Sequence, residues 1–256
     1  MCNFYDSQIT AKKIGYLFGA KLNIPKGFEG RRNTRPTNPS FIVRTNDNGE
    51  RVAEIFEFGL IPHWSKDKNM QYSTTNARDD KLMSSNLWRP CFQQKRCIIP
   101  AGGFYEHHHL DRDVQITGAK KPTNKIPYYF KLKSSDIFGF AGLYDQWEDK
   151  ESGQTIGTFS IITTDPNPLV RKIHNNKERM PTILRKEDYD FWLDESVNPK
   201  DNFDQIIFVP YPEDDMEAWQ ITKELDYNRN DDKLIEPVDN PVSLDNPQQG
   251  LFGGQV

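Results

Sequence analysis

A cysteine in the second position is the first residue of this 256-residue chain that could do chemistry. Once Met1 is removed, Cys2 carries a free α-amine and a thiol on adjacent carbons. The amine can condense with an aldehyde to a Schiff base, and the thiol can then close a five-membered thiazolidine ring on the same carbon. The reference pKa values, about 7.7–8.0 for the amine and about 8.5 for the thiol, leave part of each group nucleophilic near neutral pH. A second-position cysteine without any chemical role fits the same observation.

Two further side chains have the types that proton transfer requires. Glu106 ends the apolar stretch Gly103-Phe104-Tyr105-Glu106, where loss of hydration would raise the pKa of its carboxyl group. A solvated glutamate at the end of a strand fits that pattern equally well. His174 follows a short predicted helix over residues 166–173, and a histidine with an ordinary pKa exchanges protons near neutral pH.

We expect no metal and no cofactor. The three consecutive histidines at residues 107–109 would point to alternating faces of a strand, and no carboxylate or thiol stands at ligand spacing. No phosphate-binding glycine motif and no internal repeat is present. The odd set of three cysteines is typical of free thiols in a reducing compartment, so we expect a cytoplasmic protein.

The net charge of −4 conceals an asymmetry along the chain. From Asp201 onward there are 13 acidic and 3 basic residues, which leaves 24 acidic and 30 basic residues before that point. A mildly basic body suits nucleic acid, although a net charge of +6 is also ordinary. We expect no membrane association, because no apolar run approaches the ~18 residues of a span and no secretory signal begins the chain.

The β-forming segments outnumber the helical ones. Residues 41–44 and 52–61 are strand candidates, and residues 96–106 form an apolar strand that breaks at Gly102-Gly103, as a bulge or a close backbone approach would require. Three successive strands, at residues 127–132, 137–147 and 155–164, predict an antiparallel meander. Short helices are expected at residues 82–92, 166–173 and 186–193, and a last strand at residues 219–225.

Residues 1–227 are expected to form one domain. From residue 228 the sequence is rich in Asp, Asn, Pro and Gln, which predicts a flexible acidic tail over residues 228–256. A monomer is the default expectation for such a chain.

Four features stand together and in a fixed order: Cys2, Asn76-Ala77-Arg78, Gly103-Phe104-Tyr105-Glu106, and His174 with Arg179-Met180-Pro181. With the stretches at residues 58–64 and 96–103, they resemble the SOS-response-associated peptidase family, whose members crosslink to abasic sites in DNA. The resemblance extends from Cys2 to about residue 225. It implies a single α+β domain with a twisted, largely antiparallel, barrel-like β core and a few short peripheral helices.

The resemblance also implies a function and a set of catalytic residues. The function is to shield abasic sites in single-stranded DNA by a covalent, reversible link, in the cytoplasm or, when bound to DNA, on the nucleoid. Cys2 resembles the crosslinking residue, Asn76 the asparagine beside it, Glu106 the glutamate that assists sugar ring opening, and His174 the histidine that assists Schiff-base chemistry. Members of the family are also proposed to release their own Met1.

The chain departs from the family pattern in three places. Asn3-Phe4 replaces the usual Gly-Arg after the cysteine, His107 replaces a tryptophan, and the gap between His174 and Arg179 is longer than usual. These differences affect the expected DNA affinity more than the chemistry.

Four residues are candidates for DNA contact: Phe4, Trp64, Arg78 and Arg179. The aromatic side chains could stack on bases, and the arginines could meet phosphates, as could a cluster of arginines at residues 31–35. A core position for Trp64 and a solvated loop for the cluster fit the sequence as well. Two other functions remain open: an N-terminal-nucleophile hydrolase that uses the same four catalytic residues, and a non-catalytic single-strand binder.

Overall fold

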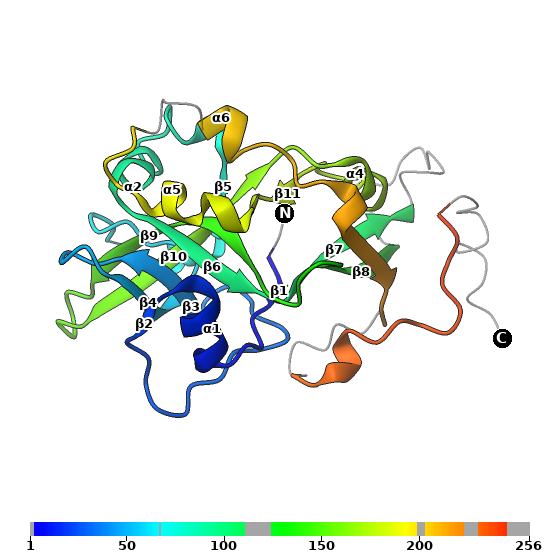
Figure 1. Cartoon of the computed structure of the whole chain (residues 1–256), viewed down its shortest axis with the longest axis horizontal. Coiled ribbons are helices and arrows are strands. Elements are labelled where there is room, and N and C mark those ends of the chain that lie inside the picture. The colour runs from blue at the N-terminus through cyan, green and yellow to red at the C-terminus, as the bar shows by residue number, and fades with distance from the viewer. Residues whose placement is uncertain (1–2, 67, 111–123, 199–202, 223–229, 245–256) are drawn as a thin grey trace.

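The computed structural model describes residues 3–66, 68–110, 124–198, 203–222 and 230–244. Two β-sheets stand side by side, a barrel and a smaller four-stranded sheet, and short helices lie around them (Figure 1). The architecture is a single α+β domain with a barrel-like core, as the resemblance implies. Within the described residues, no helix is long and apolar enough to cross a membrane.

The barrel closes because each of its five strands pairs with two others in a ring. The ring runs β3 (Pro39–Thr45), β4 (Arg51–Phe58), β10 (Thr155–Thr164), β9 (Phe138–Glu148) and β6 (Arg96–Ala101), and back to β3. Only the β4–β10 pair of the ring is parallel. Four short strands extend the barrel: β2 (Lys21–Leu22) on β4, β5 (Asn76–Arg78) and β11 (Met180–Pro181) on β10, and β12 (Ile183–Leu184) on β9.

The barrel strands separate two apolar layers because successive side chains of a strand point to opposite faces. In β3, Ile42 packs in one buried cluster with Phe58 and Phe159, while its neighbours Phe41 and Val43 pack in the other. The Phe58 and Phe159 rings stack with centroids 5.2 Å apart. Both faces of the barrel wall are therefore covered, one by the residues of its own interior and one by helices.

The four-stranded sheet is entirely antiparallel, in the order β1 (Tyr5–Asp6), β7 (Gly103–His109), β8 (Lys125–Leu132) and β13 (Met216–Gln220). The chain passes from the barrel to this sheet at Gly102, between β6 and β7. A Cβ atom on Gly103 would lie 2.3 Å from the ring of Tyr129 on β8. The predicted close approach is therefore real, but a neighbouring strand makes it.

The helices are short and lie at the ends of strands. They are α1 (Ala11–Phe18), α2 (Arg89–Gln94), α4 (Pro168–Ile173), α5 (Tyr189–Leu193) and α6 (Phe203–Ile206). Single 3₁₀ turns are η1 (Lys68–Tyr72), η2 (Asp79–Lys81), η3 (Lys186–Asp188), η4 (Glu213–Asp215) and η5 (Asp232–Leu234). Thr10 caps the start of α1, and Gly19 ends it with a φ of 60°.

Two sequence-based expectations about elements are wrong. The three strands at residues 127–164 do not form one meander, because β8 pairs with β7 and β13 in the small sheet while β9 and β10 pair in the barrel. The helix expected at residues 82–92 is confined to α2, which begins at Arg89 and carries Pro90 in its first turn. Proline is tolerated there because the first amide groups of a helix have no partner within it.

Residues 230–244 pack against the four-stranded sheet although they lie in the segment expected to be a flexible tail. Leu234 is fully buried, and the Trp219 indole nitrogen donates to the carbonyl oxygen of Ile235 over 2.7 Å. Arg32 bonds Asp232 over 2.8 Å. The rest of the predicted tail, residues 228–229 and 245–256, lies outside the described residues.

Candidate active site

The candidate residues come from both sheets and from one helix end. Asn76 begins β5 at the edge of the barrel, Glu106 lies in the middle of β7, and His174 ends α4. Cys2 lies outside the described residues, but Asn3, which follows it, contacts Asn76 directly. Asn76, Glu106 and His174 therefore lie within the described part of the chain.

Glu106 is buried among apolar groups of the sheet. Its side chain is 4% exposed, and β7 pairs it with Tyr128 of β8. Burial raises the pKa of its carboxyl group to about 7, because the ionised form loses its hydration. Near neutral pH the protonated and ionised forms of Glu106 are therefore present in similar amounts, as a group that both gives and takes protons requires.

His174 faces Glu106 from the end of α4. Asn167 caps the start of this helix, accepting from the amide of Val170 over 2.8 Å, and the Nε2 atom of His174 lies 3.4 Å from Oε2 of Glu106. The other ring nitrogen, Nδ1, lies 2.9 Å from the carbonyl oxygen of Arg179. A carbonyl only accepts, so Nδ1 carries the hydrogen and the lone pair of Nε2 points at Glu106.

The protonation of His174 differs from the sequence-based expectation. Its side chain is 3% exposed, and burial lowers its pKa to about 4. His174 is therefore neutral near pH 7, and the mobile proton of the pair lies on Glu106. In this arrangement the histidine accepts and orients, and the carboxylic acid donates.

Asn76 belongs to a small cluster of neutral polar groups. Its Nδ2 atom donates to Oδ1 of Asn3 over 3.0 Å and to Oγ1 of Thr75 over 2.9 Å. Thr75 in turn donates its hydroxyl hydrogen to Oδ1 of Asn3 over 3.1 Å. The Oδ1 atom of Asn76 is buried and has no hydrogen-bond partner among the residues that the structure describes.

The two candidate arginines both bond to acidic groups of the protein. Arg78 forms a bidentate salt bridge with Asp80: its Nε and Nη2 atoms donate to the two carboxylate oxygens over 2.9 and 2.8 Å. The side chain of Arg78 is half exposed. Arg179 is 8% exposed and bonds Asp79 over 2.7 Å. Its guanidinium also donates to Thr163. Of the two, Arg78 presents the larger surface to a phosphate, while Arg179 chiefly fixes the loop whose carbonyl holds His174.

Trp64 is 55% exposed, which fits base stacking better than a core position. The turn before it begins at Gly59, whose φ of 104° favours glycine; a Cβ there would lie 2.3 Å from the carbonyl oxygen of Gln71. Asp145 anchors the same loop, accepting from the backbone amide of His63 over 2.9 Å. The loop is therefore fixed while its indole faces solvent.

Phe4 and an aromatic residue that the sequence did not single out lie around one hollow. Phe4, Arg35 and Tyr72 are among the residues lining a cavity of about 470 Å³. Tyr72 is 68% exposed and ends η1. The polar sequence around Tyr72 contains no motif that predicts a functional role. Only the exposure of its ring indicates a candidate for base contact.

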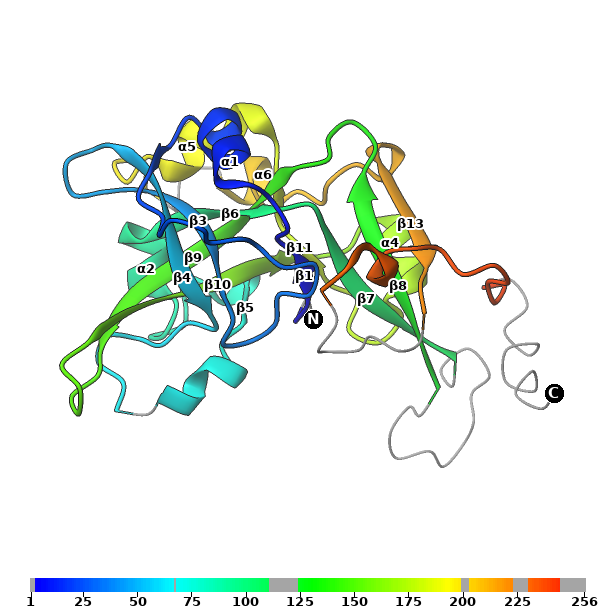
Figure 2. The same cartoon turned by 90° about the horizontal axis from the view of Figure 1, so that it is seen from below.

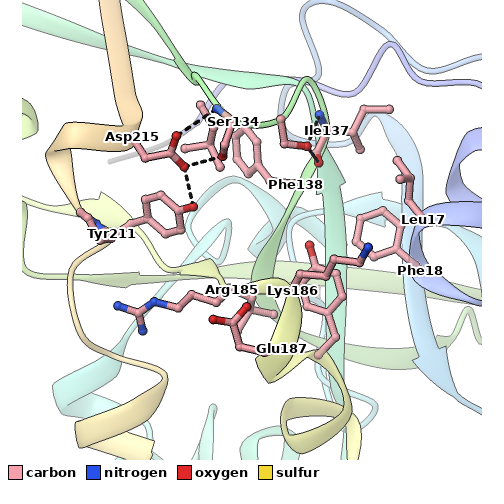
Figure 3. A pocket seen from close by; sticks show the side chains of 15 residues that line it. Leu17, Phe18, Ser134, Ile137, Phe138, Arg185, Lys186, Glu187, Tyr211 and Asp215 are labelled. Carbon is pink, nitrogen blue, oxygen red and sulfur yellow. Dashed lines mark hydrogen bonds between the residues drawn. The ribbon is translucent and has the colours of Figure 1, made fainter.

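A larger hollow lies elsewhere. It measures about 600 Å³ and opens between α1, the loop after β8, and the segment from Leu184 to Tyr189 (Figure 3). Asp215 accepts there from Ser134 and Tyr211, and none of the candidate residues lines it. In Figure 2, α1 and α5 lie on the side of the molecule away from β5. Among the described residues, no cluster of three or more histidine, cysteine or acidic groups could hold a metal ion.

The chain is similar to known proteins over most of its length. The family model described as SOS response associated peptidase (SRAP) matches residues 1–227. The chain belongs to this family. It is 38% identical over 218 residues to the "Abasic site processing protein YoqW" of Bacillus subtilis, which covers 83% of this chain and 89% of that protein.

Two further relatives and one solved structure extend the comparison. YoaM of B. subtilis, which carries the same description, is 34% identical and covers 94% of this chain and 99% of its own length. The chicken HMCES protein, also named an abasic site processing protein, is 30% identical over 75% of this chain and 60% of its own. A Bacteroides thetaiotaomicron crystal structure superposes with a TM-score of 0.80 at 29% identity, over 93% of this chain and all of that one.

Proposed function

We propose that this chain processes abasic sites in single-stranded DNA by forming a covalent, reversible bond through Cys2. The observation that carries the proposal is the buried Glu106–His174 pair beside the first strand: the backbone amide of Tyr105, next to Glu106, donates to the carbonyl oxygen of Phe4, next to Asn3, over 3.3 Å. Membership of the SRAP family and the description of its relatives as abasic site processing proteins support abasic sites as the substrate.

The reaction begins with the sugar. An abasic deoxyribose is mostly a closed hemiacetal, so one group must remove the proton of the C1 hydroxyl while a proton is added to the ring oxygen. Protonated Glu106, with a pKa of about 7, can give its proton to the ring oxygen from one carboxyl oxygen and take the hydroxyl proton on the other, so it ends protonated. The neutral amine of Cys2 then attacks the C1 aldehyde and gives a carbinolamine.

Loss of water and ring closure follow. Protonated Glu106 gives its proton to the carbinolamine hydroxyl, which leaves as water and produces the Schiff base. The thiol of Cys2 adds to the same carbon, and its proton returns to the Glu106 carboxylate, so Glu106 ends in the form in which it began this stage. His174 orients the carboxyl group throughout, and the same steps in reverse release the DNA.

Binding of the strand is assigned to the exposed groups. Trp64 and Tyr72 would stack on flanking bases, Phe4 would contact the strand from the cavity that it lines with Tyr72, and Arg78 would meet a phosphate. We assign Arg179 mainly to positioning, since its guanidinium bonds Asp79. The amine of Cys2 cannot react before Met1 is removed, and the proposal includes removal of Met1 by the chain itself.

The deciding experiment uses protein whose intact mass shows loss of Met1. Incubation with a single-stranded oligonucleotide that carries one abasic site should give a heat-stable, size-shifted band, and an intact-base oligonucleotide should give none. Cys2→Ser, which keeps the amine but cannot form the thiazolidine, should give only an adduct that requires reductant for trapping. Cys2→Ala should give the same labile adduct at most.

Two results would contradict the proposal. A durable crosslink from Cys2→Ser would exclude the thiazolidine, and crosslinking by protein with a chemically blocked α-amine would exclude the amine as nucleophile. Equal affinity for intact-base and abasic DNA, with no covalent band from the wild type, would instead indicate a non-catalytic single-strand binder. Amide hydrolysis without any band would indicate the N-terminal-nucleophile hydrolase.

A further inference from the structure

The side-chain oxygen of Asn3 accepts hydrogen bonds from two neighbouring residues. Its Oδ1 atom accepts from Nδ2 of Asn76 over 3.0 Å and from the hydroxyl of Thr75 over 3.1 Å. Thr75 is 3% exposed, whereas Asn3 and Asn76 are partly exposed, so this small network is partly shielded from water. The network joins the start of the chain to β5, which is 73 residues away in sequence.

This network fixes which end of the Asn76 amide faces the site. A side-chain amide has two N–H donors and one carbonyl acceptor. Both donors of Asn76 are used, one on Asn3 and one on Thr75, at 3.0 and 2.9 Å. The remaining atom, Oδ1, is buried and has no partner among the described residues. A buried acceptor in that condition costs free energy unless a donor reaches it.

The proposed reaction supplies such a donor. Once Met1 is gone, the Cys2 amine has N–H groups to give, and it belongs to the residue directly before Asn3. An acceptor that takes one N–H of the amine leaves the nitrogen lone pair free for the sugar carbonyl. The opposite orientation of Asn76 would present N–H donors, which compete for that lone pair.

We propose that Asn3 is a positioning residue that sets the orientation of the Asn76 amide, so that Oδ1 of Asn76 remains the atom available to accept a hydrogen bond from the nucleophile. This inference rests on the proposed function. It concerns the position at which the chain departs from the Gly-Arg expected after Cys2, and a glycine there could not supply the acceptor. Asn3 itself touches no reacting atom in this role.

The test compares three substitutions in protein whose intact mass shows loss of Met1. Asn3→Asp keeps an acceptor oxygen, Asn3→Leu has similar size without one, and Asn3→Gly removes the side chain without adding bulk. At saturating abasic DNA, the crosslinking rate constant should fall roughly tenfold in Asn3→Leu and Asn3→Gly, the effect of one lost oriented hydrogen bond. Asn3→Asp should stay within about threefold of the wild type.

Binding separates positioning from a merely structural role. The affinity for an intact-base oligonucleotide should stay within about twofold in all three variants, because no DNA contact is assigned to Asn3. Wild-type rates in Asn3→Leu and Asn3→Gly, or an Asn3→Asp variant as slow as they are, would overturn the inference.

A second measurement does not depend on crosslinking. The side-chain amide hydrogens of Asn76, assigned in nuclear magnetic resonance spectra by their absence from Asn76→Ala, should exchange slowly in the wild type and in Asn3→Asp, and faster in Asn3→Leu. Unchanged exchange in Asn3→Leu would refute the positioning role. If the wild type formed no crosslink, the proposed function would fail, and the exchange data would still decide what orients Asn76.

Discussion

On one side of the candidate site, Glu106 and His174 are both more than nine-tenths buried and face each other over 3.4 Å. On the other side, Asn3, Thr75 and Asn76 are neutral groups joined by three hydrogen bonds. We call these the proton side and the amide side. Burial shifts both pKa values of the proton side, whereas nothing on the amide side ionises near neutral pH. The site thus separates the storage of a proton from the orientation of the nucleophile.

The largest expected effect comes from removing the proton of the proton side. Glu106→Gln keeps the shape of the side chain but cannot transfer a proton, so the crosslinking rate constant at saturating abasic DNA should fall about a hundredfold to a thousandfold. Single-turnover gel assays measure it. Glu148→Gln, at the exposed last residue of β9, is the matched control and should react like the wild type. Equal rates in both variants would remove Glu106 from the mechanism.

The stability of the fold should report the same carboxyl group. Between pH 4.5 and about 7, folded Glu106 is protonated while the unfolded chain is not, so the free energy of unfolding falls as pH rises through this window. The loss is up to about 3 kcal/mol. Glu106→Gln lacks this titrating group. In thermal unfolding, the stability of the variant relative to the wild type should therefore rise from pH 4.5 to about 7 and stay constant above pH 7.

His174 acts in the opposite direction in both proteins. Its pKa is lowered to about 4, so unfolding is favoured as pH falls below about 6.5, and this contribution cancels in the comparison with Glu106→Gln. A stability difference between the two proteins that does not change with pH would show that Glu106 is not held protonated.

The pH dependence of crosslinking should depend on both the amine and the proton side. The rate needs a neutral amine, with a reference pKa of about 7.7–8.0, and a protonated Glu106, with a pKa of about 7. A bell-shaped profile with its maximum between pH 7 and 8 should result, falling about tenfold per pH unit on each side. In Glu106→Gln the fall at high pH should disappear. If the crosslinking rate of Glu106→Gln still fell at high pH, a group other than Glu106 would be responsible for that fall.

The smallest effect is expected on the amide side. Thr75→Val removes one of the two groups that receive the Asn76 donors but leaves Asn3 in place, so crosslinking should slow only about threefold. The ratio of the crosslinking rate constants of Thr75→Val and the wild type should be the same at every pH, which rate measurements over a series of pH values check. A ratio that changes with pH would mean that the two sides are electrostatically coupled.

Much of the proton side could be predicted from sequence because the signal is local. Glu106 follows an apolar stretch within one strand, and its burial and raised pKa follow from those neighbours. The lowered pKa of His174 was not predicted, since it arises where α4 packs against β7. The sequence around a histidine at the end of a short helix does not predict which other element will pack against it.

The amide side and the sheet assignments depend on contacts that sequence patterns do not encode. Asn3 and Asn76 meet across 73 residues, and neither lies in a periodic pattern that would predict the contact. The strands β8 and β9 were located almost to the residue, yet the loop between them carries the chain from one sheet to the other. Strand propensity acts on neighbours in sequence, whereas the choice of a pairing partner depends on distant chain.

The long-range pairing of the first strand has a consequence for biosynthesis. Tyr5 pairs with Phe104 of β7, and Glu57 of β4 pairs with Thr158 of β10, so the partners are 99 and 101 residues apart. At a translation speed of about 5–20 residues per second, the start of the chain leaves the ribosome about 5–20 s before its partner strand leaves it. His174 follows later still. Any release of Met1 by the chain itself is therefore a post-translational event, in competition with enzymes that meet the nascent end first.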